Sequence, residues 1–298
     1  MQILYKRARN IYCVTPHNIR EAIMLDFTVN TAVCTRCGEC IADCPARIIS
    51  MQDGVPTIVP DKAATCYRCQ HCLAVCPTGA VSILGLRPTG SRPLHGAIVD
   101  PDKLETLIKG RRSVRRYRPE NLEPELLQRL LDVAWHAPTG VNSRDVLFTV
   151  VDDREKLDSL RDKVMTGLGR LVREERLPEG MEFFANFVHL WEEKGVDILF
   201  RGAPHLLIAS APSHGASPVP DCLIALSYFE LFAQSLGVGT LWNGLTKWAI
   251  NNLLPETRQR LGIPEDHAIG YVMTFGKPAI HYHRTVQHGP TTINRVAL

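Results

Sequence analysis

Cysteines at every third position form the most chemically specific pattern in the sequence. They make up two runs, in each of which three cysteines follow one another at this spacing and a fourth comes directly before a proline. The second run repeats the first at an offset of 32 residues, and 44–50 still aligns with 76–82. The segment is therefore an internal duplication. The runs are Cys34, Cys37, Cys40 and Cys44, then Cys66, Cys69, Cys72 and Cys76.

This spacing predicts two [4Fe–4S] clusters, because three thiolates from one tight turn and a fourth from elsewhere suit a cubane. Where two such runs occur together, the fourth cysteine of each run binds the cluster of the other run. The region 24–85 resembles the bacterial two-cluster ferredoxin domain. The expected ligand sets are Cys34, Cys37, Cys40 and Cys76 for one cluster, and Cys66, Cys69, Cys72 and Cys44 for the other.

Other uses of cysteine fit this pattern less well. Structural zinc uses paired Cys-x2-Cys knuckles, often with histidine, and needs neither the third cysteine nor the prolines. A disulfide framework needs an oxidising compartment, and we expect no secretion signal here. His71, inside the second run, is expected to face solvent rather than bind metal. Cys13 and Cys222 are left over, and Cys222 falls in an apolar helix, where a buried thiol is the ordinary explanation.

The composition indicates a globular chain with room for two domains. Its 298 residues are 45% apolar and 22% charged, and no stretch approaches about 18 uninterrupted apolar residues, which argues against a membrane protein. The segment 1–23 alone carries the net charge of +3 and is either a non-native extension or a surface arm. We expect a cytoplasmic protein that binds neither nucleic acid nor membrane. The charged residues of this basic leader are Lys6, Arg7, Arg9, Arg20 and Glu21.

A segment rich in Pro, Gly and Arg, 86–98, marks a linker, so a second domain is expected over 99–298. Its first helix is expected over 101–110, after an Asp-Pro start and before a Gly stop. The next eight residues, 111–118, include five arginines. So dense a cationic run is a solvated surface, a nucleic-acid patch or a phosphate clamp, in which Arg forks and a Ser hydroxyl hold a phosphate monoester.

The segments that follow the arginine run decide among these interpretations. An apolar helical stripe over 126–135 precedes the turn-rich stretch 137–144 and the apolar strand 146–151. Arg-Arg-Ser-x-Arg, a helix, Ala-Pro-Thr-Gly-x-Asn and a strand, in this order, resemble the start of the nitroreductase family of flavin enzymes. The resemblance continues through Gly-Ala-Pro at 202–204, an apolar helix over 221–236, a loop at 236–244, a strand at 269–276 and Tyr-His-Arg at 282–284.

The resemblance implies an α+β chain, with a small ferredoxin-like two-cluster domain followed by an α/β nitroreductase-type domain. The central, mostly antiparallel sheet of the second domain is flanked by helices. It also implies FMN as cofactor and a homodimer with FMN at the interface. The implied FMN-binding residues are Arg111, Arg112, Ser113, Arg115, Pro138, Thr139, Asn142, Trp242, Asn243, Gly244 and Arg284.

These residues have different implied roles. The arginine run and Arg284 hold the flavin phosphate and ring edge, backbone N–H groups near Asn243 and Gly244 lie against the ring nitrogen N5, and the 138–142 turn covers the ring from the partner subunit. Other arginines of the run, Arg116 and Arg118, are expected on the surface. No catalytic side chain is expected, because the flavin carries the chemistry.

The sequence departs from the family pattern in three places. Positions 144–147 read Arg-Asp-Val-Leu where the family often has Gln-Pro-Trp, and Gln287 and His288 stand where a second arginine is frequent. The stretch 154–200 matches poorly. Its aromatic part either shapes the substrate pocket or packs as an ordinary core helix.

The two halves together predict an iron–sulfur flavoprotein oxidoreductase. Electrons enter at the clusters, pass to FMN and leave as a pair to an organic acceptor such as a nitroaromatic, quinone or enone. No dinucleotide fingerprint is present, which favours reduced ferredoxin as donor, with NAD(P)H admitted directly over the flavin as the other option. Two alternatives stay open: the same cofactors run in reverse as a substrate dehydrogenase, and a non-catalytic electron carrier or redox sensor.

Overall fold

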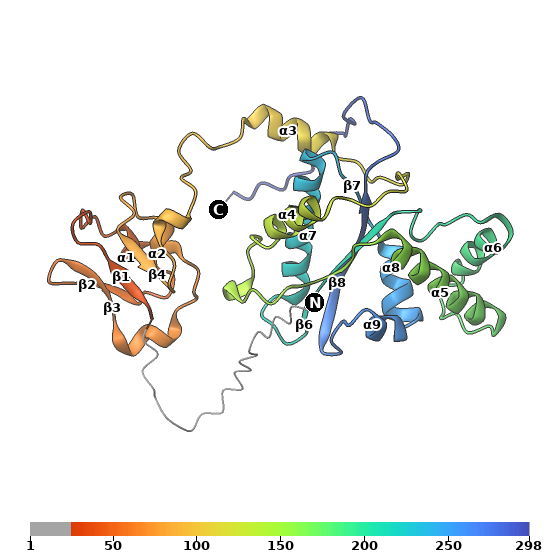
Figure 1. The fold of residues 1–298 in the computed structure, drawn as a ribbon, viewed down its shortest axis with the longest axis horizontal. Coiled ribbons are helices and arrows are strands. Elements are labelled where there is room, and N and C mark those ends of the chain that lie inside the picture. Colours follow the sequence, from red (N-terminus) through yellow and green to blue (C-terminus); the bar gives the residue numbers. More distant parts are fainter. Residues whose placement is uncertain (1–24, 298) are drawn as a thin grey trace, which may run out of the picture. The chain divides into compact units, whose positions relative to one another are not determined.

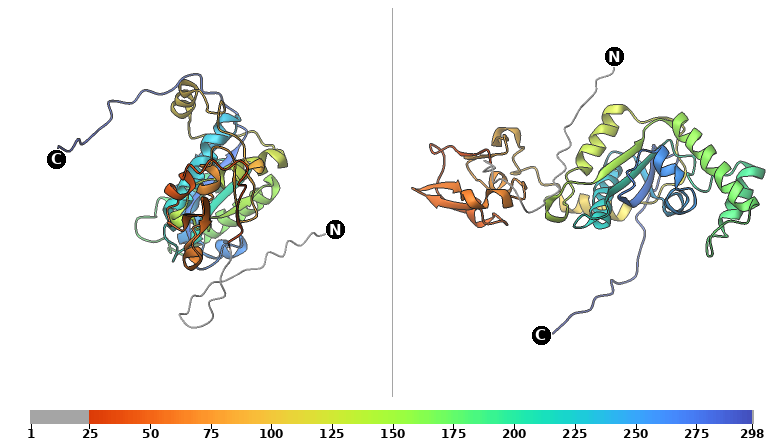
Figure 2. Two further views of the ribbon diagram at one scale, coloured as in Figure 1. Left: turned by 90° about the vertical axis from the view of Figure 1, so that its left-hand side faces the viewer. Right: turned by 90° about the horizontal axis from the view of Figure 1, so that it is seen from below.

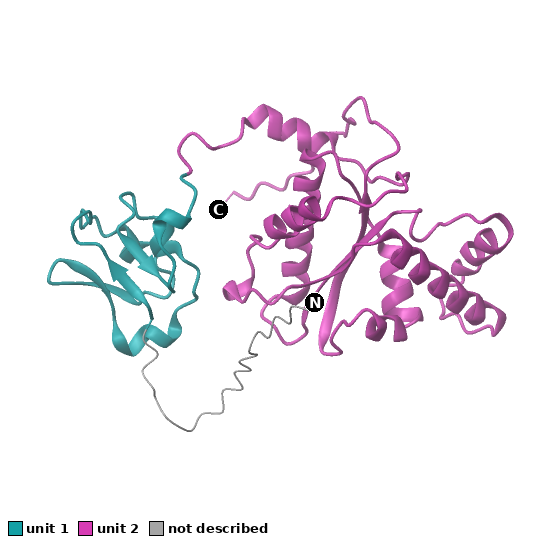
Figure 3. Cartoon of the chain, in the orientation of Figure 1, with its two compact units in different colours: residues 1–93 teal, residues 94–298 magenta. Residues whose placement is uncertain are grey.

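The computed structural model describes residues 25–297, so the basic leader with Cys13 lies outside the described residues. The chain forms two compact units, of which the first ends at Pro93 and the second starts at Leu94, within the expected linker 86–98 (Figure 3). In the described part of the chain, no helix combines the length and the apolar character needed to cross a membrane.

The first unit contains two small antiparallel sheets, two one-turn α-helices and two 3-10 helices, η1 (Pro60–Thr65) and η2 (Pro88–Gly90) (Figure 1). The pairing of β1 with β4 joins the start of the duplicated segment to its end, while β2 and β3 form a hairpin. Each helix carries the third cysteine of a run, Cys40 or Cys72, and both cysteines are buried. The elements are β1 (Phe27–Val29), α1 (Glu39–Ala42), β2 (Ile49–Gln52), β3 (Val55–Ile58), α2 (His71–Ala74) and β4 (Val81–Ile83).

The duplication extends to the backbone conformation of the cysteine runs. Left-handed residues recur at matching places, although a left-handed conformation costs about 1–2 kcal/mol for residues other than Gly. The same turn geometry is therefore imposed on both runs. The matched pairs are Arg36 and Arg68 (φ 59° and 55°), Gly38 and Gln70 (φ 81° and 63°), and Arg47 and Gly79 (φ 51° and 63°).

A four-stranded antiparallel sheet forms the centre of the second unit, in the order β5-β6-β8-β7. The α+β class with a mostly antiparallel sheet, expected from the sequence, is confirmed. The segment expected as a loop at 236–244 contains β7, because its buried residues Thr240 and Leu241 pair with β8. The strands are β5 (Leu147–Val151), β6 (His205–Pro212), β7 (Gly239–Trp242) and β8 (His267–Gly276).

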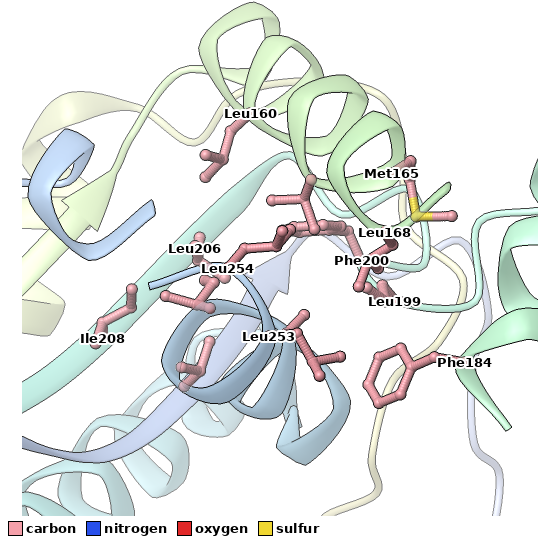
Figure 4. Close-up of a cluster of buried hydrophobic side chains, with 14 of the residues drawn as sticks. Leu160, Met165, Leu168, Phe184, Leu199, Phe200, Leu206, Ile208, Leu253 and Leu254 are labelled. Carbon is pink, nitrogen blue, oxygen red and sulfur yellow. The ribbon is translucent and has the colours of Figure 1, made fainter. Parts of the chain in front are cut away.

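Alternate residues of the central strands face two different cores, as the two-residue period of a strand requires. Leu206 and Ile208 of β6 belong to the first core, shown in Figure 4, while Leu207 and Ala209 belong to the second. Helices cover both faces of the sheet (Figures 1 and 2). The first core contains residues of α5 (Arg154–Arg173), α6 (Phe184–Lys194) and the π-helical segment η4 (Ala249–Leu253), which lies between α8 (Gly244–Trp248) and α9 (Glu256–Arg260). The second contains residues of α4 (Pro124–Ala134) and α7 (Pro218–Ser235).

Several helix predictions can be compared directly with the structure. The expected helix 101–110 is α3 (Pro101–Gly110), and the Asp100 carboxylate caps it by accepting a hydrogen bond from the Lys103 N–H at 3.0 Å. Helix α7 begins at Pro218, three residues before the expected start, because proline is well accommodated in the first turn of a helix. Cys222 on this helix is fully buried, as expected.

His205, at the start of β6, is a fully buried histidine. Its Nε2 accepts a hydrogen bond from the Leu122 backbone N–H at 2.8 Å, and its ring centre lies 5.1 Å from that of Phe275. Burial lowers the pKa of His205 below its usual 6.5, against the opposing effect of Asp152 and Asp153. A nitrogen that accepts a hydrogen bond carries no proton, so this packing requires the neutral ring.

We expect the free energy of unfolding of the second unit to be largest above pH 6.5 and to fall as the pH drops below it. The unfolded chain binds a proton at His205 that the folded chain disfavours, so acid stabilises the unfolded state. All four tryptophans, at 135, 191, 242 and 248, lie in this unit, so urea unfolding followed by tryptophan fluorescence measures it.

The His205→Gln variant keeps an acceptor for the Leu122 N–H and is expected to have a flatter pH dependence. The exposed His95 provides the matched control, since His95→Gln should retain the full slope. Burial also lowers the pKa of His267, which accounts for a remaining slope in the His205 variant. An unchanged slope in His205→Gln would contradict the assignment.

Candidate functional site

Two cavities in the first unit are each lined by four cysteines. The first is lined by three cysteines of the first run and one of the second, and the other by three cysteines of the second run and one of the first. The structure thus brings together the two sets that the sequence predicted, although the role of each cysteine as a ligand stays a prediction. The sets are Cys34, Cys37, Cys40 and Cys76, then Cys66, Cys69, Cys72 and Cys44.

The thiols of each set influence one another electrostatically. Burial raises the pKa of Cys40, and the neighbouring thiols Cys76, Cys37 and Cys34 raise it further. Burial likewise raises the pKa of Cys72, to about 12. Four thiolates that line one cavity repel one another. A positively charged metal core would compensate their charge and displace their protons.

Hydrogen bonds stabilise the thiolate of Cys76. Its Sγ accepts a bond from the Ala80 N–H at 3.2 Å and lies 3.8 Å from the Thr78 hydroxyl oxygen. Burial alone would raise the pKa of Cys76, but these bonds outweigh it and lower the pKa below the usual 9.0. A thiolate that accepts hydrogen bonds is the form that binds iron.

The donor chemistry of both cavities fits [4Fe–4S] clusters, which are held by cysteine thiolates. Each set supplies four sulfurs. His71 also borders the second cavity, but its Nδ1 lies 3.2 Å from Asp43 Oδ2, which gives it a carboxylate partner. When bound, each cluster supplies storage for a single electron.

The second candidate site begins where α3 ends. Arg111 follows the last turn of this helix and its Nη1 donates to Glu230 Oε1 at 3.1 Å. Glu230 lies on α7, is almost fully buried, and also accepts from the Thr240 hydroxyl at 3.1 Å. The carboxylate therefore joins the arginine run, α7 and β7.

The arginine run lies against the edge of the sheet formed by β7. The Val114 N–H donates to the Thr240 carbonyl at 2.8 Å, and Ser113 pairs with Thr240 in a parallel bridge. Gly239 allows this approach, because a Cβ there would lie 2.6 Å from a methyl carbon of Val114. Arg115, Arg116 and Arg118 are exposed.

The C-terminal tail meets the arginine run at Ser113, whose carbonyl accepts from the Tyr282 hydroxyl at 3.4 Å. A cavity next to this contact is lined by residues of α3, β7 and the tail, including Gly110, Gly239 and Tyr282. Arg284, two residues further along the tail, is exposed. Its expected role at the flavin phosphate stays a prediction.

The 138–142 turn has a strained backbone and is anchored by the carboxylate of Asp221. Val141 and Asn142 both have positive φ, at 48° and 56°, which is an outlying conformation for the β-branched Val141. The Gly140 N–H donates to both carboxylate oxygens of the buried Asp221, at 3.0 and 3.2 Å. Backbone strain of this kind persists where surrounding contacts enforce it, often at functional sites. Pro138 is exposed, and Thr139 and Asn142 are half-buried.

The end of β7 leads directly into α8. Asn243 is engaged within the fold: its N–H donates to the Val272 carbonyl, its Oδ1 accepts from the Thr246 N–H and its Nδ2 donates to the Leu199 carbonyl. At Gly244 the Tyr271 hydroxyl approaches the backbone closely, and a Cβ there would lie 2.9 Å from it. Of the two residues expected near the flavin N5, Gly244 is thus the better candidate.

Trp242, the last residue of β7, packs against Tyr271 of β8. Its ring lies 5.2 Å from that of Tyr271 at an interplanar angle of 67°. Lys247 lies 5.2 Å above the same Tyr271 ring and donates from Nζ to the Gly270 carbonyl at 2.9 Å. Burial lowers the pKa of Lys247. The arginine run, the strained 138–142 turn and the segment 242–244 offer cationic, backbone and aromatic groups of the kinds that bind a flavin.

Comparison with known proteins decides the family of the chain. The model of the nitroreductase family matches residues 108–277, more than half of the sequence. The chain belongs to the nitroreductase family. A second model, of the 4Fe-4S dicluster domain, matches residues 33–81 of this nitroreductase-family chain.

Individual relatives agree with this placement. Nitroreductase NfnB of Mycolicibacterium smegmatis is 30% identical over 202 residues, which cover 58% of this chain and 81% of that protein. A nitroreductase from Desulfitobacterium hafniense, solved with bound FMN, is 26% identical with a TM-score of 0.51, and the match covers 66% of this chain and all of that one. A nitroreductase from Bacteroides fragilis shares the fold, with a TM-score of 0.52 at 23% identity over 65% of this chain and 99% of that one.

This nitroreductase-family chain is therefore an FMN-dependent oxidoreductase with an N-terminal iron–sulfur domain, and its cofactors are FMN and two [4Fe–4S] clusters. The cavities of the first unit and the cationic segment of the second fit these groups. When bound, FMN supplies the chemistry that converts single electrons into a pair.

Two residues of the candidate flavin site escaped the sequence analysis. Glu230 and Asp221 have no predicted role, whereas in the structure each is hydrogen-bonded to a segment expected to contact FMN. A carboxylate inside an otherwise apolar helix was the available signal, since buried charges need partners. Their partners, 119 and 81 residues away, were not recognisable from spacing.

We expect Arg111→Ala to lower FMN occupancy, because it removes a cationic group from the proposed flavin site. It also leaves the buried Glu230 without its ion-pair partner, which is expected to cost about 1–3 kcal/mol of stability. FMN content per chain by absorbance and urea unfolding measure the two effects separately.

The double variant Arg111→Ala/Glu230→Gln removes the unpaired charge and should recover most of the stability without recovering FMN. Arg116→Ala, an exposed arginine of the same run, is the matched control and should keep normal FMN content. Equal FMN content in Arg111→Ala and Arg116→Ala would mean that Arg111 has no part in flavin binding.

Proposed function

We propose that this enzyme takes electrons from a donor at its two clusters, passes them to FMN and delivers a pair to a small organic acceptor. The observation that supports this most is the combination, in one chain, of two four-cysteine cavities with a nitroreductase-family unit. An iron–sulfur unit in the same chain can carry single electrons from a donor to the flavin. Nitroaromatics, quinones and enones are the acceptor classes we favour.

The donor we favour is reduced ferredoxin or a similar one-electron protein, because a two-electron donor such as NAD(P)H reduces flavin directly. The absence of a dinucleotide fingerprint in the sequence supports the same choice. NAD(P)H admitted directly over the flavin is the second option.

We further propose a homodimer that covers FMN at its interface. Helix α3 supports this, since it carries Leu104 and Ile108 at 40% and 48% exposure and buries no residue of its own. Ile224 and Tyr228 on α7 are exposed to 37% and 42%. An exposed apolar surface of this kind is typical of a protein–protein interface, and the partner subunit is the occupant we propose.

The test is anaerobic screening of the FMN-loaded protein against reduced ferredoxin, NADH and NADPH, followed by a panel of acceptors. Reduction of the flavin by the one-electron donor and its reoxidation by an acceptor would support the proposed direction. Flavin reduction by an organic substrate, with electrons leaving through the clusters, would reverse it. A preparation with iron and sulfide that takes up no FMN would contradict the enzyme proposal altogether.

Cys37→Ser is expected to remove one cluster and to lower donor-driven turnover several-fold, while dithionite still reduces FMN. Cys37 is exposed, so the substitution leaves the core of the first unit intact. Cys222→Ser, a cysteine outside both sets, is the matched control and should keep full turnover. Unchanged turnover in Cys37→Ser, with iron content reduced, would place the clusters outside the electron path.

A further inference from the structure

The two four-cysteine cavities differ in the residues around the sulfurs. The first cavity is bordered by the cationic Arg36 and the hydroxyl-bearing Thr78. The second is bordered by three isoleucines, and also by the polar side chains of Tyr67, Gln70 and His71, of which His71 has the Asp43 carboxylate as its partner. The duplication makes the comparison direct, because each position of one run has a counterpart in the other.

One of the two exchanged cysteines is followed, two residues later, by a residue with a hydroxyl group. Thr78 follows Cys76 by two residues, and its hydroxyl oxygen lies 3.8 Å from the Cys76 Sγ. With Cys76 as a thiolate, the hydroxyl is the donor. The counterpart of Thr78 after Cys44 is Ala46, which has no polar side-chain atom.

Backbone hydrogen bonds to cysteine sulfur occur in both sets and therefore do not distinguish them. The Ala80 N–H donates to Cys76 Sγ at 3.2 Å in the first set, and the Arg68 N–H donates to Cys66 Sγ at 3.4 Å in the second. The difference therefore lies in the side chains and in solvent access.

A cationic side chain next to the cavity and a more exposed cysteine both distinguish the first set from the second. Arg36 borders the first cavity, and its guanidinium packs beside Gly54, where a Cβ would lie 3.4 Å from the guanidinium carbon. Its counterpart Arg68 is not among the described residues that line the second cavity. Cys37 in the first set is exposed, while its counterpart Cys69 is half-buried.

Reduction adds one electron, and thus one negative charge, to a cluster, and no bond forms or breaks. Hydrogen bonds to the sulfurs, a nearby cation and solvent access all stabilise the added charge and raise the reduction potential. All three differences between the cavities act in the same direction.

We propose that Thr78 and Arg36 make the two clusters unequal, so that the one held by Cys34, Cys37, Cys40 and Cys76 has the higher reduction potential. A one-electron donor then reduces this cluster first and is itself oxidised by one electron. The inference goes beyond the proposed function and does not depend on it, because it concerns the two potentials and needs neither FMN turnover nor an acceptor.

The test is anaerobic potentiometry of the full cluster-loaded chain, with the reduced clusters followed by electron paramagnetic resonance. Thr78→Val keeps the shape of Thr78 without its hydroxyl and should lower only the higher of the two potentials. We expect at least a threefold change in the ratio of oxidised to reduced cluster at a fixed potential, about 28 mV at 59 mV per tenfold. Ala46→Thr is the reciprocal variant and should raise only the lower potential.

Arg36→Gln provides a second route to the same cluster and should also lower the higher potential. Arg92→Gln removes an exposed arginine of the same unit and should move neither potential. Iron and sulfide contents identify any variant that loses a cluster, and the remaining variants then decide the outcome. The proposal is overturned if Thr78→Val and Arg36→Gln leave the higher potential unchanged, or if they shift the lower one instead.

Discussion

The first unit depends on an exchange of cysteines between its two halves. Neither cysteine run lines a cavity alone, because Cys44 and Cys76 each complete the set of the opposite run. The pairing of β1 with β4 holds the ends of the duplicated segment together and makes this exchange possible. The four thiols of one set repel one another as thiolates, so bound clusters and the fold would stabilise each other.

Buried carboxylates have a comparable organising role in the second unit. Asp221 and Glu230 lie on the same helix, α7, and are held respectively by the backbone of the strained 138–142 turn and by Arg111. A buried charge is costly unless it is paired, so these contacts fix the two segments relative to α7. The residues proposed to surround FMN thus take their positions from one apolar helix with two acidic residues.

Much of this arrangement is local and was therefore predictable. The cysteine spacing indicated both sets, and the cap at Asp100 marked the start of α3. The parts that escaped prediction depend on distant partners. Glu230 pairs with a residue far away in the sequence, and β7 is a strand only because β8 pairs with it. The left-handed Val141 is likewise enforced by its surroundings, since a β-branched residue disfavours that conformation.

The central claim is that the iron–sulfur unit delivers electrons to the flavin of its own chain or dimer. Anaerobic rapid mixing of the fully loaded protein with two equivalents per chain of a one-electron reductant, followed at flavin wavelengths, tests it most directly. The account predicts that the clusters are reduced first and that the flavin then bleaches with a rate constant independent of protein concentration. Clusters that stay reduced beside an oxidised flavin, or a rate that grows in proportion to protein concentration, would contradict it.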